Sequence, residues 1–312
     1  MPGNRLLVTK PKILVVGSSN TDMVIKGDFL PGAGETVAGG TFFMNPGGKG
    51  ANQAVAAARL NGNISFICKT GNDIFGRKAI QVFQEEGIDT RLAIEDPVQP
   101  SGIALIMVDN KGENCISVAL GANAGLLPID LLPAMDLIGS ASIILMQLEI
   151  PLETVVHLAA LASDKGLKFV LNPAPACELP DELLQKTYII TPNSTEAEML
   201  TGIKVVDIDS AKLAAQKLKE RGVKNVIITL GKSGALVLHE DVFTHVPASK
   251  VEAVDSTAAG DVFNGALVVA LSEGRTIPEA TEFAARAAAI SVTRLGAQSS
   301  APYRSELENL SS

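Results

Sequence analysis

Short apolar runs alternate with longer segments of helical period along most of the chain. The runs are four to six residues long, as expected of buried strands, and lie at residues 13–16, 64–68, 143–148, 168–171, 188–191 and 226–230. Apolar positions three and four residues apart predict helices at 51–60, 76–86, 152–165, 210–221, 261–272 and 278–293. This alternation predicts an α/β fold: a doubly wound, mostly parallel sheet with helices on both faces.

Two segments depart from the alternation. Residues 23–43 carry several glycines and a proline between short β-prone pieces at 36–38 and 41–43, without a helical period. Residues 103–108 and 114–120 flank the turn 109–112 and predict a hairpin. We expect segments 23–46 and 101–121 to pair as a small sheet outside the main one, within a single domain spanning 1–312.

Composition excludes several classes of function. The chain has 312 residues and a net charge of −8, so it lacks the basic field that a nucleic-acid partner requires. Its three cysteines, Cys68, Cys115 and Cys177, are odd in number and far apart, which favours neither a disulfide framework nor a zinc site and is typical of a reducing compartment. No apolar run is long enough for a membrane span, and residues 1–12 have no signal-peptide pattern. We expect a cytoplasmic protein.

A turn of small residues at 258–260 leads directly into the predicted helix at 261–272. Small side chains leave the backbone N–H groups open, and the positive end of the helix dipole adds to them, so the turn suits an anion. Asp261 follows at once and could accept a proton from a hydroxyl brought up to that anion, which suggests kinase chemistry. An ordinary helix start with an acidic first turn explains the same residues equally well.

Polar residues follow the predicted strands, where ligands bind in open α/β sheets. Asn20 and Asp22 lie in a polar loop expected after the first strand, and the later strands are followed by Glu149, Asn172, Asn193, Glu196 and the segment 231–234. One asparagine after a strand is usually a turn former, but acids and amides together favour a polyol such as a sugar.

The glycine-rich segment 45–50 precedes an alanine-rich helix, so backbone can approach a ligand there. Taken by itself, Lys49 would be interpreted as a surface lysine, and Glu149 would be interpreted as the first acid of a helix. Each residue, however, lies at the predicted binding edge. Walker A, G-x-G-x-x-G, H-E-x-x-H and G-x-S-x-G motifs are absent, and His157, His239 and His245 are not expected near that edge. Phosphoryl transfer would therefore depend on the turn before Asp261.

Several motifs together resemble the ribokinase family of sugar and nucleoside kinases over nearly the whole chain. They are Gly47-Gly48-Lys49-Gly50-Ala51-Asn52-Gln53-Ala54, Leu148-Glu149 after a strand, Asn172-Pro173-Ala174-Pro175-Ala176, Thr191-Pro192-Asn193-Ser194-Thr195-Glu196, Thr229-Leu230-Gly231, Asp255-Ser256-Thr257-Ala258-Ala259-Gly260-Asp261 and Val292-Thr293-Arg294-Leu295-Gly296-Ala297-Gln298-Ser299-Ser300. Only the residues before Lys12 and after Tyr303 fall outside the resemblance. Ser256 stands where threonine is frequent, and Ala285 where a larger polar residue often meets the adenine.

The resemblance implies ATP-dependent phosphorylation of D-ribose at O5, with Asp261 as the general base. The implied sugar ligands are Asn20, Asp22, Gly48, Lys49, Asn52 and Glu149. The implied nucleotide site comprises Asn193, Thr229, Leu230, Gly231, Lys232, Ser233, Gly234 and Ala285, with the amides of Ala258, Ala259 and Gly260 on the transferred phosphoryl group.

The resemblance also implies two metals: Mg²⁺ organised by Glu196 through water, and K⁺ bound by Asp255, Thr257, Ser291, Arg294, Gly296 and Ser300. We expect Asp255 to be a buried carboxylate whose charge the K⁺ neutralises. The resemblance further implies that the small sheet is a lid over the sugar and that it pairs two subunits into a homodimer. A kinase for deoxyribose or another small sugar is the nearest alternative. A non-catalytic sugar sensor is a further one, which would need neither the proton acceptor nor the phosphate turn.

Overall fold

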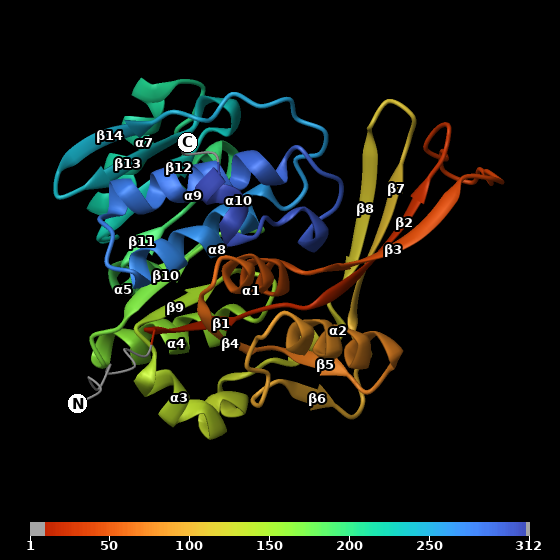
Figure 1. The fold of residues 1–312 in the computed structure, drawn as a ribbon, viewed down its shortest axis with the longest axis horizontal. Coiled ribbons are helices and arrows are strands. Elements are labelled where there is room, and N and C mark those ends of the chain that lie inside the picture. Colours follow the sequence, from red (N-terminus) through yellow and green to blue (C-terminus); the bar gives the residue numbers. More distant parts are fainter. Residues whose placement is uncertain (1–9, 310–312) are drawn as a thin grey trace, which may run out of the picture.

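The computed structural model describes residues 10–309, so the expectations for residues 1–9 and 310–312 lie outside the described part. An eight-stranded sheet in the order β14-β13-β12-β11-β10-β9-β1-β4 forms the centre of the molecule (Figure 1). Its parallel strands are β1 (Lys12–Val16), β4 (Asn63–Ile67), β9 (Ile143–Met146), β10 (Lys168–Leu171), β11 (Ile189–Ile190) and β12 (Asn225–Thr229). The predicted fold class is confirmed.

The antiparallel edge of this sheet was not predicted. Strands β13 (Ala235–His239) and β14 (Val242–Val246) form a hairpin beside β12. Its two turn residues, Glu240 and Asp241, have φ of 49° and 63°, the left-handed values that a tight hairpin turn requires. Glutamate and aspartate are poor sequence signals for that conformation, which asparagine and glycine adopt more readily.

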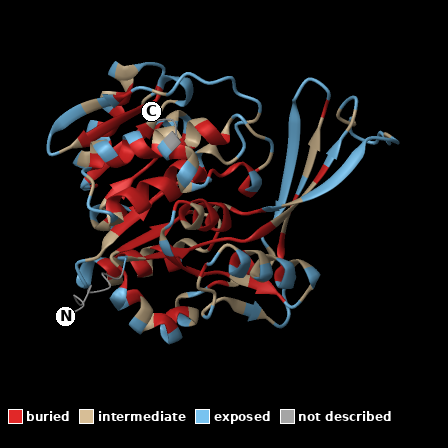
Figure 2. Ribbon diagram, in the orientation of Figure 1, coloured by how far each residue is buried: buried red, intermediate tan, exposed pale blue. Residues whose placement is uncertain are grey.

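Helices cover both faces of the main sheet. The first helical layer consists of α1 (Lys49–Arg59), α2 (Ile74–Glu85), α8 (Ala259–Ser272), α9 (Ile277–Ser291) and α10 (Arg304–Asn309). The second consists of α3 (Met135–Ser140), α4 (Leu152–Asp164), α5 (Asp181–Lys186), α6 (Ser194–Thr201) and α7 (Ile208–Glu220). Alternate residues of β1 belong to the two cores, Ile13 and Val15 to one and Leu14 and Val16 to the other. Figure 2 shows this buried centre in red.

A second sheet of four strands projects from the body, in the order β3 (Thr41–Gly47), β2 (Asn20–Lys26), β7 (Gly102–Val108) and β8 (Asn114–Ala119) (Figure 1). This small sheet is the one expected from segments 23–46 and 101–121. The expectation that Asn20 and Asp22 lie in a loop is wrong: they begin β2, paired with both β3 and β7. Residues 36–38 are not a strand. Strands β5 (Lys69–Gly71) and β6 (Ile94–Asp96) form a further unpredicted pair.

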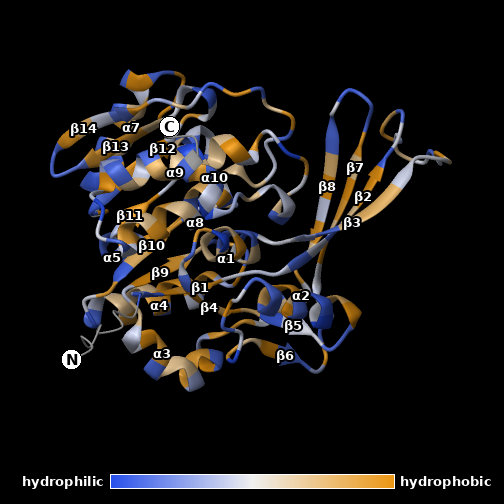
Figure 3. Ribbon diagram, viewed as in Figure 1, coloured by the Kyte–Doolittle hydropathy of each residue, from blue (hydrophilic) through white to orange (hydrophobic). Residues whose placement is uncertain are grey.

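Both faces of the small sheet expose large apolar side chains, Phe43, Ile116 and Val118 on the face of Asp22 and four others on the opposite face. Ile25, Phe42, Met44 and Leu105 are between 47% and 57% exposed, and Figure 3 shows the hydrophobic colouring of these strands. The strand registers pair these residues with one another or with Met23, and side chains alternate along a strand, so they lie on the face opposite Asp22.

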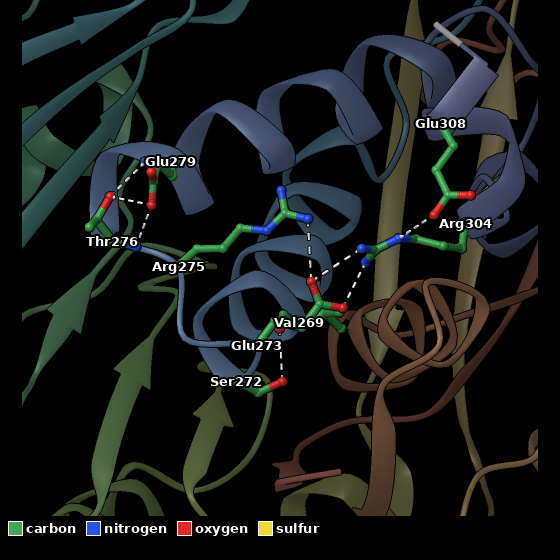
Figure 4. Close-up of polar contacts among 8 residues, drawn as sticks. All are labelled: Val269, Ser272, Glu273, Arg275, Thr276, Glu279, Arg304 and Glu308. Atoms are coloured by element: carbon green, nitrogen blue, oxygen red, sulfur yellow. Dashed lines mark hydrogen bonds and ion pairs between the residues drawn. The ribbon is translucent and has the colours of Figure 1, made fainter. Parts of the chain in front are cut away.

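Polar contacts fix the connection between α8 and α9 (Figure 4). The carboxylate of Glu273, at the end of α8, accepts hydrogen bonds from Arg304 at 2.9 Å and Arg275 at 3.3 Å, while Thr276 caps α9. The guanidinium groups of both arginines lie over the ring of Phe283, at 4.6 and 4.8 Å from its centroid. These contacts attach α10 to the body. Among the described residues, no helix has the length and apolar character needed to cross a bilayer.

Candidate active site

The chain reverses its direction of winding at β1, which lies between β4 and β9, and the candidate site is at the carboxyl ends of these strands. Glu149 follows β9, and its Oε2 accepts hydrogen bonds from Ser18 Oγ at 2.5 Å and from the backbone N–H of Lys49 at 2.9 Å. Gly48, just before α1, has φ of 89°, and a Cβ there would lie 2.7 Å from the backbone nitrogen of Asn20. Only glycine fits this close approach.

Asn20 and Asp22 lie at the start of β2, where the small sheet leaves the body. Asn20 Oδ1 accepts a hydrogen bond from Asn123 Nδ2 at 2.8 Å, and Asn123 Oδ1 accepts one from the N–H of Ser19 at 2.9 Å. The Asp22 carboxylate accepts none from the part of the chain that the structure describes. Burial, with the nearby charges of Glu149 and Asp261, raises the pKa of Asp22 to about 6.

Asn123 was missed by the sequence analysis. It is completely buried in the 3₁₀ turn Gly121–Gly125 after β8, and its contact with Asn20 spans 103 residues of sequence. Because the turn follows a strand of the small sheet, only the pairing of β2 with β7 brings Asn123 to the site.

Asp261 lies in the first turn of α8 and is 6% exposed. Its Oδ2 accepts a hydrogen bond from Asn52 Nδ2 and its Oδ1 one from Gln53 Nε2, each at 2.9 Å. Burial raises the pKa of Asp261 above its usual value, and the charge of Lys49 and the two amides reduce this rise. A buried carboxylate with a raised pKa is well suited to accept a proton.

The turn before α8 is held in an unusual backbone conformation. Ala258 has φ of 58°, a left-handed value, and is the N-cap of α8. Asp255 stabilises the turn: its Oδ1 accepts the N–H of Thr257 and its Oδ2 the N–H of Gly296, each at 2.9 Å. Burial tends to raise the pKa of Asp255, but these hydrogen bonds hold the pKa below its usual value.

The expectation that Asp255 is a buried carboxylate is wrong, since it is only half-buried. The segment before it lies open, with Val251 and Val254 exposed by 44% and 60%.

Residues with several of the predicted roles line one cavity of about 180 Å³. Lys49, Glu196, Asp261 and the residues 258–260 line it, together with Asn172, Ala174, Thr191, Asn193, Thr229, Ser256 and Asn264. Glu196 and Asn193 form a reciprocal cap at the start of α6, with both hydrogen bonds at 2.9 Å. Burial raises the pKa of Glu196, partly offset by the amide of Asn193 and by Lys49.

Lys49 is a cation surrounded by three acidic side chains. Burial tends to lower the pKa of Lys49, but the carboxylates of Asp261, Glu149 and Glu196 raise this pKa above its ordinary value. The ammonium group therefore remains charged among three acids, beside the cavity.

A cleft of about 810 Å³ adjoins this cavity and shares Asn193, Thr229, Ser256, Ala259 and Gly260 with it. Of the predicted nucleotide residues, Leu230, Gly231, Lys232, Gly234 and Ala285 also line the cleft. Lining residues that the sequence analysis missed include the segment 248–251, Phe263 and Val292.

Ser233 is not among the residues that line the cleft. Its carbonyl oxygen lies 2.7 Å from Nε2 of His245. His245 likewise does not line the cleft or the cavity, and neither does His157 or His239.

The predicted K⁺ residues come from two segments that Asp255 joins through Gly296. The side chains of Ser291 and Ser300 donate to backbone carbonyls of their own turns, and the guanidinium of Arg294 pairs with Glu306. Among these predicted residues, five backbone carbonyl oxygens accept no hydrogen bond from residues 10–309, namely those of Asp255, Thr257, Arg294, Gly296 and Ser300.

A phosphate-sized turn beside a buried proton acceptor, at the edge of a doubly wound sheet, is the arrangement of a phosphotransferase. The model of the pfkB family of carbohydrate kinases matches residues 10–304, and the chain belongs to this family. The resemblance stated from the motifs is thereby confirmed.

The relatives with curated names include two kinds of pentose kinase. The chain is 45% identical to a ribokinase of Haemophilus influenzae over 294 residues, which cover 94% of this chain and 96% of the relative. It is 39% identical to a deoxyribokinase of Salmonella typhi over 291 residues, covering 93% and 95%.

Solved structures agree with the fold. A ribokinase of Thermotoga maritima superposes with a TM-score of 0.90 at 42% identity, covering 97% of this chain and all of that one. A ribokinase of Arabidopsis thaliana in complex with ribose and ATP has a TM-score of 0.92 at 31% identity, covering 97% and 99%.

Proposed function

We propose that the protein transfers the γ-phosphoryl group of ATP to O5 of D-ribose, giving D-ribose 5-phosphate and ADP. The observation that carries this proposal is the position of Asp261, buried between the sugar-binding candidates and the turn at 258–260. Ribokinases from Haemophilus influenzae and other organisms, similar over nearly the whole chain, support the choice of sugar.

The sugar would bind where β1, β2 and α1 meet. Asp22 has a carboxylate without a hydrogen-bond donor among residues 10–309, so ribose hydroxyls would supply the missing donors. Asn20 directs its oxygen to Asn123, which leaves its Nδ2 to donate to the ligand. Lys49, Asn52, Glu149 and the open backbone at Gly48 would complete the contacts.

The chemical step needs one proton acceptor and one anion site. Asp261 would take the proton of the 5-hydroxyl while O5 attacks the γ-phosphorus, and the bond from that phosphorus to the bridging oxygen of ADP breaks. The amides of Ala258, Ala259 and Gly260, at the start of α8, would hold the transferred group. ATP would occupy the cleft of about 810 Å³, with its base near Ala285.

Magnesium fits the cavity through Glu196. One oxygen of its carboxylate accepts the N–H of Asn193, and the other is free to hold a metal-bound water. Among the described residues no three metal-binding side chains gather, as expected for a Mg²⁺ held mainly by water and phosphate. The bound ion would neutralise charge on the phosphates.

Potassium fits the two segments joined by Asp255. The unused carbonyls of Thr257, Arg294, Gly296 and Ser300 are hard oxygen donors, which suit an alkali cation, and Ser291 would add a further carbonyl. The Asp255 carboxylate supplies the negative charge. By holding the turn at 258–260 the ion would aim its amides at the phosphoryl group.

The small sheet would close over the sugar as a lid, with β2 carrying two of the sugar ligands. The exposed apolar residues Ile25, Phe42, Met44 and Leu105 lie on its opposite face, which favours pairing of two lids in a homodimer. We place the protein in the cytoplasm, without nucleic-acid or membrane partners, in keeping with its acidic charge and unpaired Cys68, Cys115 and Cys177.

The test is a kinase assay with ATP and a panel of sugars. We expect ADP release with D-ribose to exceed that with every other sugar. The deoxyribokinase of Salmonella typhi makes deoxyribose the second candidate, and faster turnover of deoxyribose would favour it. Sugar binding without ADP release would instead indicate a sensor.

A further inference from the structure

Gln53 is a buried amide in direct contact with Asp261 to which neither the family resemblance nor the proposed mechanism assigns a role. It lies on α1 and is completely buried. Its Nε2 donates to Asp261 Oδ1 at 2.9 Å and to Asn172 Oδ1 at 3.0 Å, and its Oε1 accepts from Gln147 Nε2 at 2.6 Å.

The orientation of these amides follows from a single charge. An ionised carboxylate only accepts hydrogen bonds, so Gln53 must present its Nε2 to Asp261 and its Oε1 to Gln147. Asn172 then accepts from Gln53 through Oδ1, and its Nδ2 donates to the carbonyl of Thr191 at 3.3 Å. Every amide in this series therefore has one permitted orientation.

The same series of hydrogen bonds returns to the phosphate turn. Thr191 Oγ1 donates to Asn264 Oδ1 at 2.7 Å, and Asn264 Nδ2 donates to the carbonyl oxygen of Gly260 at 2.8 Å. Gly260 directly precedes Asp261, so the contacts form a closed ring. The ring connects the proton acceptor with the backbone of the turn that would hold the phosphoryl group.

Packing alone does not explain these residues. Gln53, Gln147, Thr191 and Asn264 are each at most 2% exposed, and apolar side chains would fill the same space without desolvating amides. Gln147 Oε1 is even buried without a hydrogen-bond partner among the described residues. A buried polar ring with an unsatisfied atom costs stability, which suggests that it serves the reaction.

We propose that Gln53 is a positioning residue for phosphoryl transfer, which fixes the rotation of the Asp261 carboxylate toward the acceptor hydroxyl. The inference rests on the proposed role of Asp261 as proton acceptor. Asn52 and Gln53 each hold one carboxylate oxygen, so the plane of the carboxylate is defined by two donors on successive residues of α1. Without the Gln53 donor the Asp261 carboxylate can rotate, while the sugar contacts of Asn52 remain in place.

A replacement at position 53 has two expected effects. Misorientation of the base lowers kcat, and the usual effect of removing a supporting hydrogen bond is about 10- to 100-fold. The Gln53 hydrogen bond lowers the pKa of Asp261, so its loss raises that pKa. The acid limb of the pH profile of kcat/KM therefore moves upward.

The test compares Gln53→Met and Gln53→Asn with Gln147→Met in kinase assays on ribose across pH. Methionine keeps the volume of glutamine, and asparagine keeps an amide that is too short to reach Asp261. Both Gln53 variants should lose kcat, shift the acid limb upward and keep KM for ribose within about three-fold. Gln147→Met removes a buried amide whose one hydrogen bond to the described residues is with Gln53, so it should lower the melting temperature similarly with a smaller loss of kcat and no shift of the limb.

A merely structural role predicts a different pattern. Equal losses of kcat in the Gln53 and Gln147 variants with an unmoved acid limb, or wild-type kcat in a folded Gln53 variant, would overturn the inference. Asp261→Asn distinguishes this from failure of the proposed function. If that variant is inactive while the Gln53 variants are normal, only the positioning role is lost. If it remains active, the proton acceptor itself is misassigned.

Discussion

The carboxylate of Asp22 should destabilise the free protein, and Asp22→Asn should relieve this cost. Asp22 is half-buried, accepts no hydrogen bond from residues 10–309, and lies near the charges of Glu149 and Asp261. Burial first, and then these two charges, raise its pKa from 3.8 to about 6. We interpret this as a site prepared for sugar hydroxyls, which would supply the hydrogen bonds that the protein does not.

The sign of the pH dependence follows from the raised pKa. Between pH 3.8 and about 6 the folded protein binds more protons at Asp22 than the unfolded chain, so stability falls as pH rises through this window and stays low above it. At about 1.36 kcal/mol per pH unit the difference corresponds to at most about 3 kcal/mol. Solvent screening of this partly exposed side chain reduces the expected effect to about 1–2 kcal/mol.

Asparagine has the shape of aspartate without its charge. We therefore expect sugar-free Asp22→Asn to exceed the wild type in free energy of unfolding by about 1–2 kcal/mol at pH 8, and by clearly less at pH 4.5. Urea unfolding followed by circular dichroism measures both. Ribose affinity, measured by calorimetry, should fall, because a neutral amide replaces an acceptor of hydroxyl hydrogen bonds.

The control is Asp28→Asn, which removes the same charge from an exposed position in the connection from β2 to β3. It should change neither stability nor affinity appreciably. If Asp22→Asn is no more stable than the wild type at pH 8, or if its advantage is the same at pH 4.5, the carboxylate is not held at a cost in the free protein and the reasoning is refuted.

Three further predictions concern the cation, the lid and the C-terminal helix. The kcat in potassium should exceed the kcat in a bulky organic cation by about 100-fold, which is the usual effect of one well-placed oxyanion donor. Asp255→Ala should abolish this response but not ribose binding, and equal rates in potassium, sodium and the organic cation would exclude the site. The hairpin turn at 109–112 should exchange amide hydrogens more slowly with ribose present, since a lid must exclude water, and unchanged exchange would contradict closure. Arg304→Ala should lower the free energy of unfolding, measured in urea, by about 1–2 kcal/mol, because the variant loses the ion pair with Glu273 and the cation–π contact with Phe283. An unchanged value would show that α10 contributes little to stability.

The parts of the site that depend on local sequence could be predicted. Gly48 and Ala258 lie in short segments whose small residues already imply exposed backbone at a helix start, and the structure gives both left-handed φ values. The parallel strands of the main sheet followed from their apolar runs, because burial on both faces leaves a continuous signal.

The residues that orient the site could not be predicted in this way. Asn123 reaches Asn20 across 103 residues, and Gln53 reaches Asp261 across 208. Each looks like an ordinary polar residue beside a turn or on an alanine-rich helix. Their roles arise only when β2 pairs with β7 and α1 packs against α8. The same tertiary pairing places Asn20 in a strand where polar composition indicated a loop.

The central claim is that Asp261 accepts the proton of the attacking hydroxyl, and Asp261→Asn tests it most directly. Wild type and variant would be compared for ATP-dependent formation of ribose 5-phosphate, with ribose binding measured by calorimetry and folding by thermal melting. We predict a kcat lower by about 100- to 10,000-fold, with ribose affinity and fold retained. A folded variant that turns over ribose at nearly the wild-type rate would contradict the account.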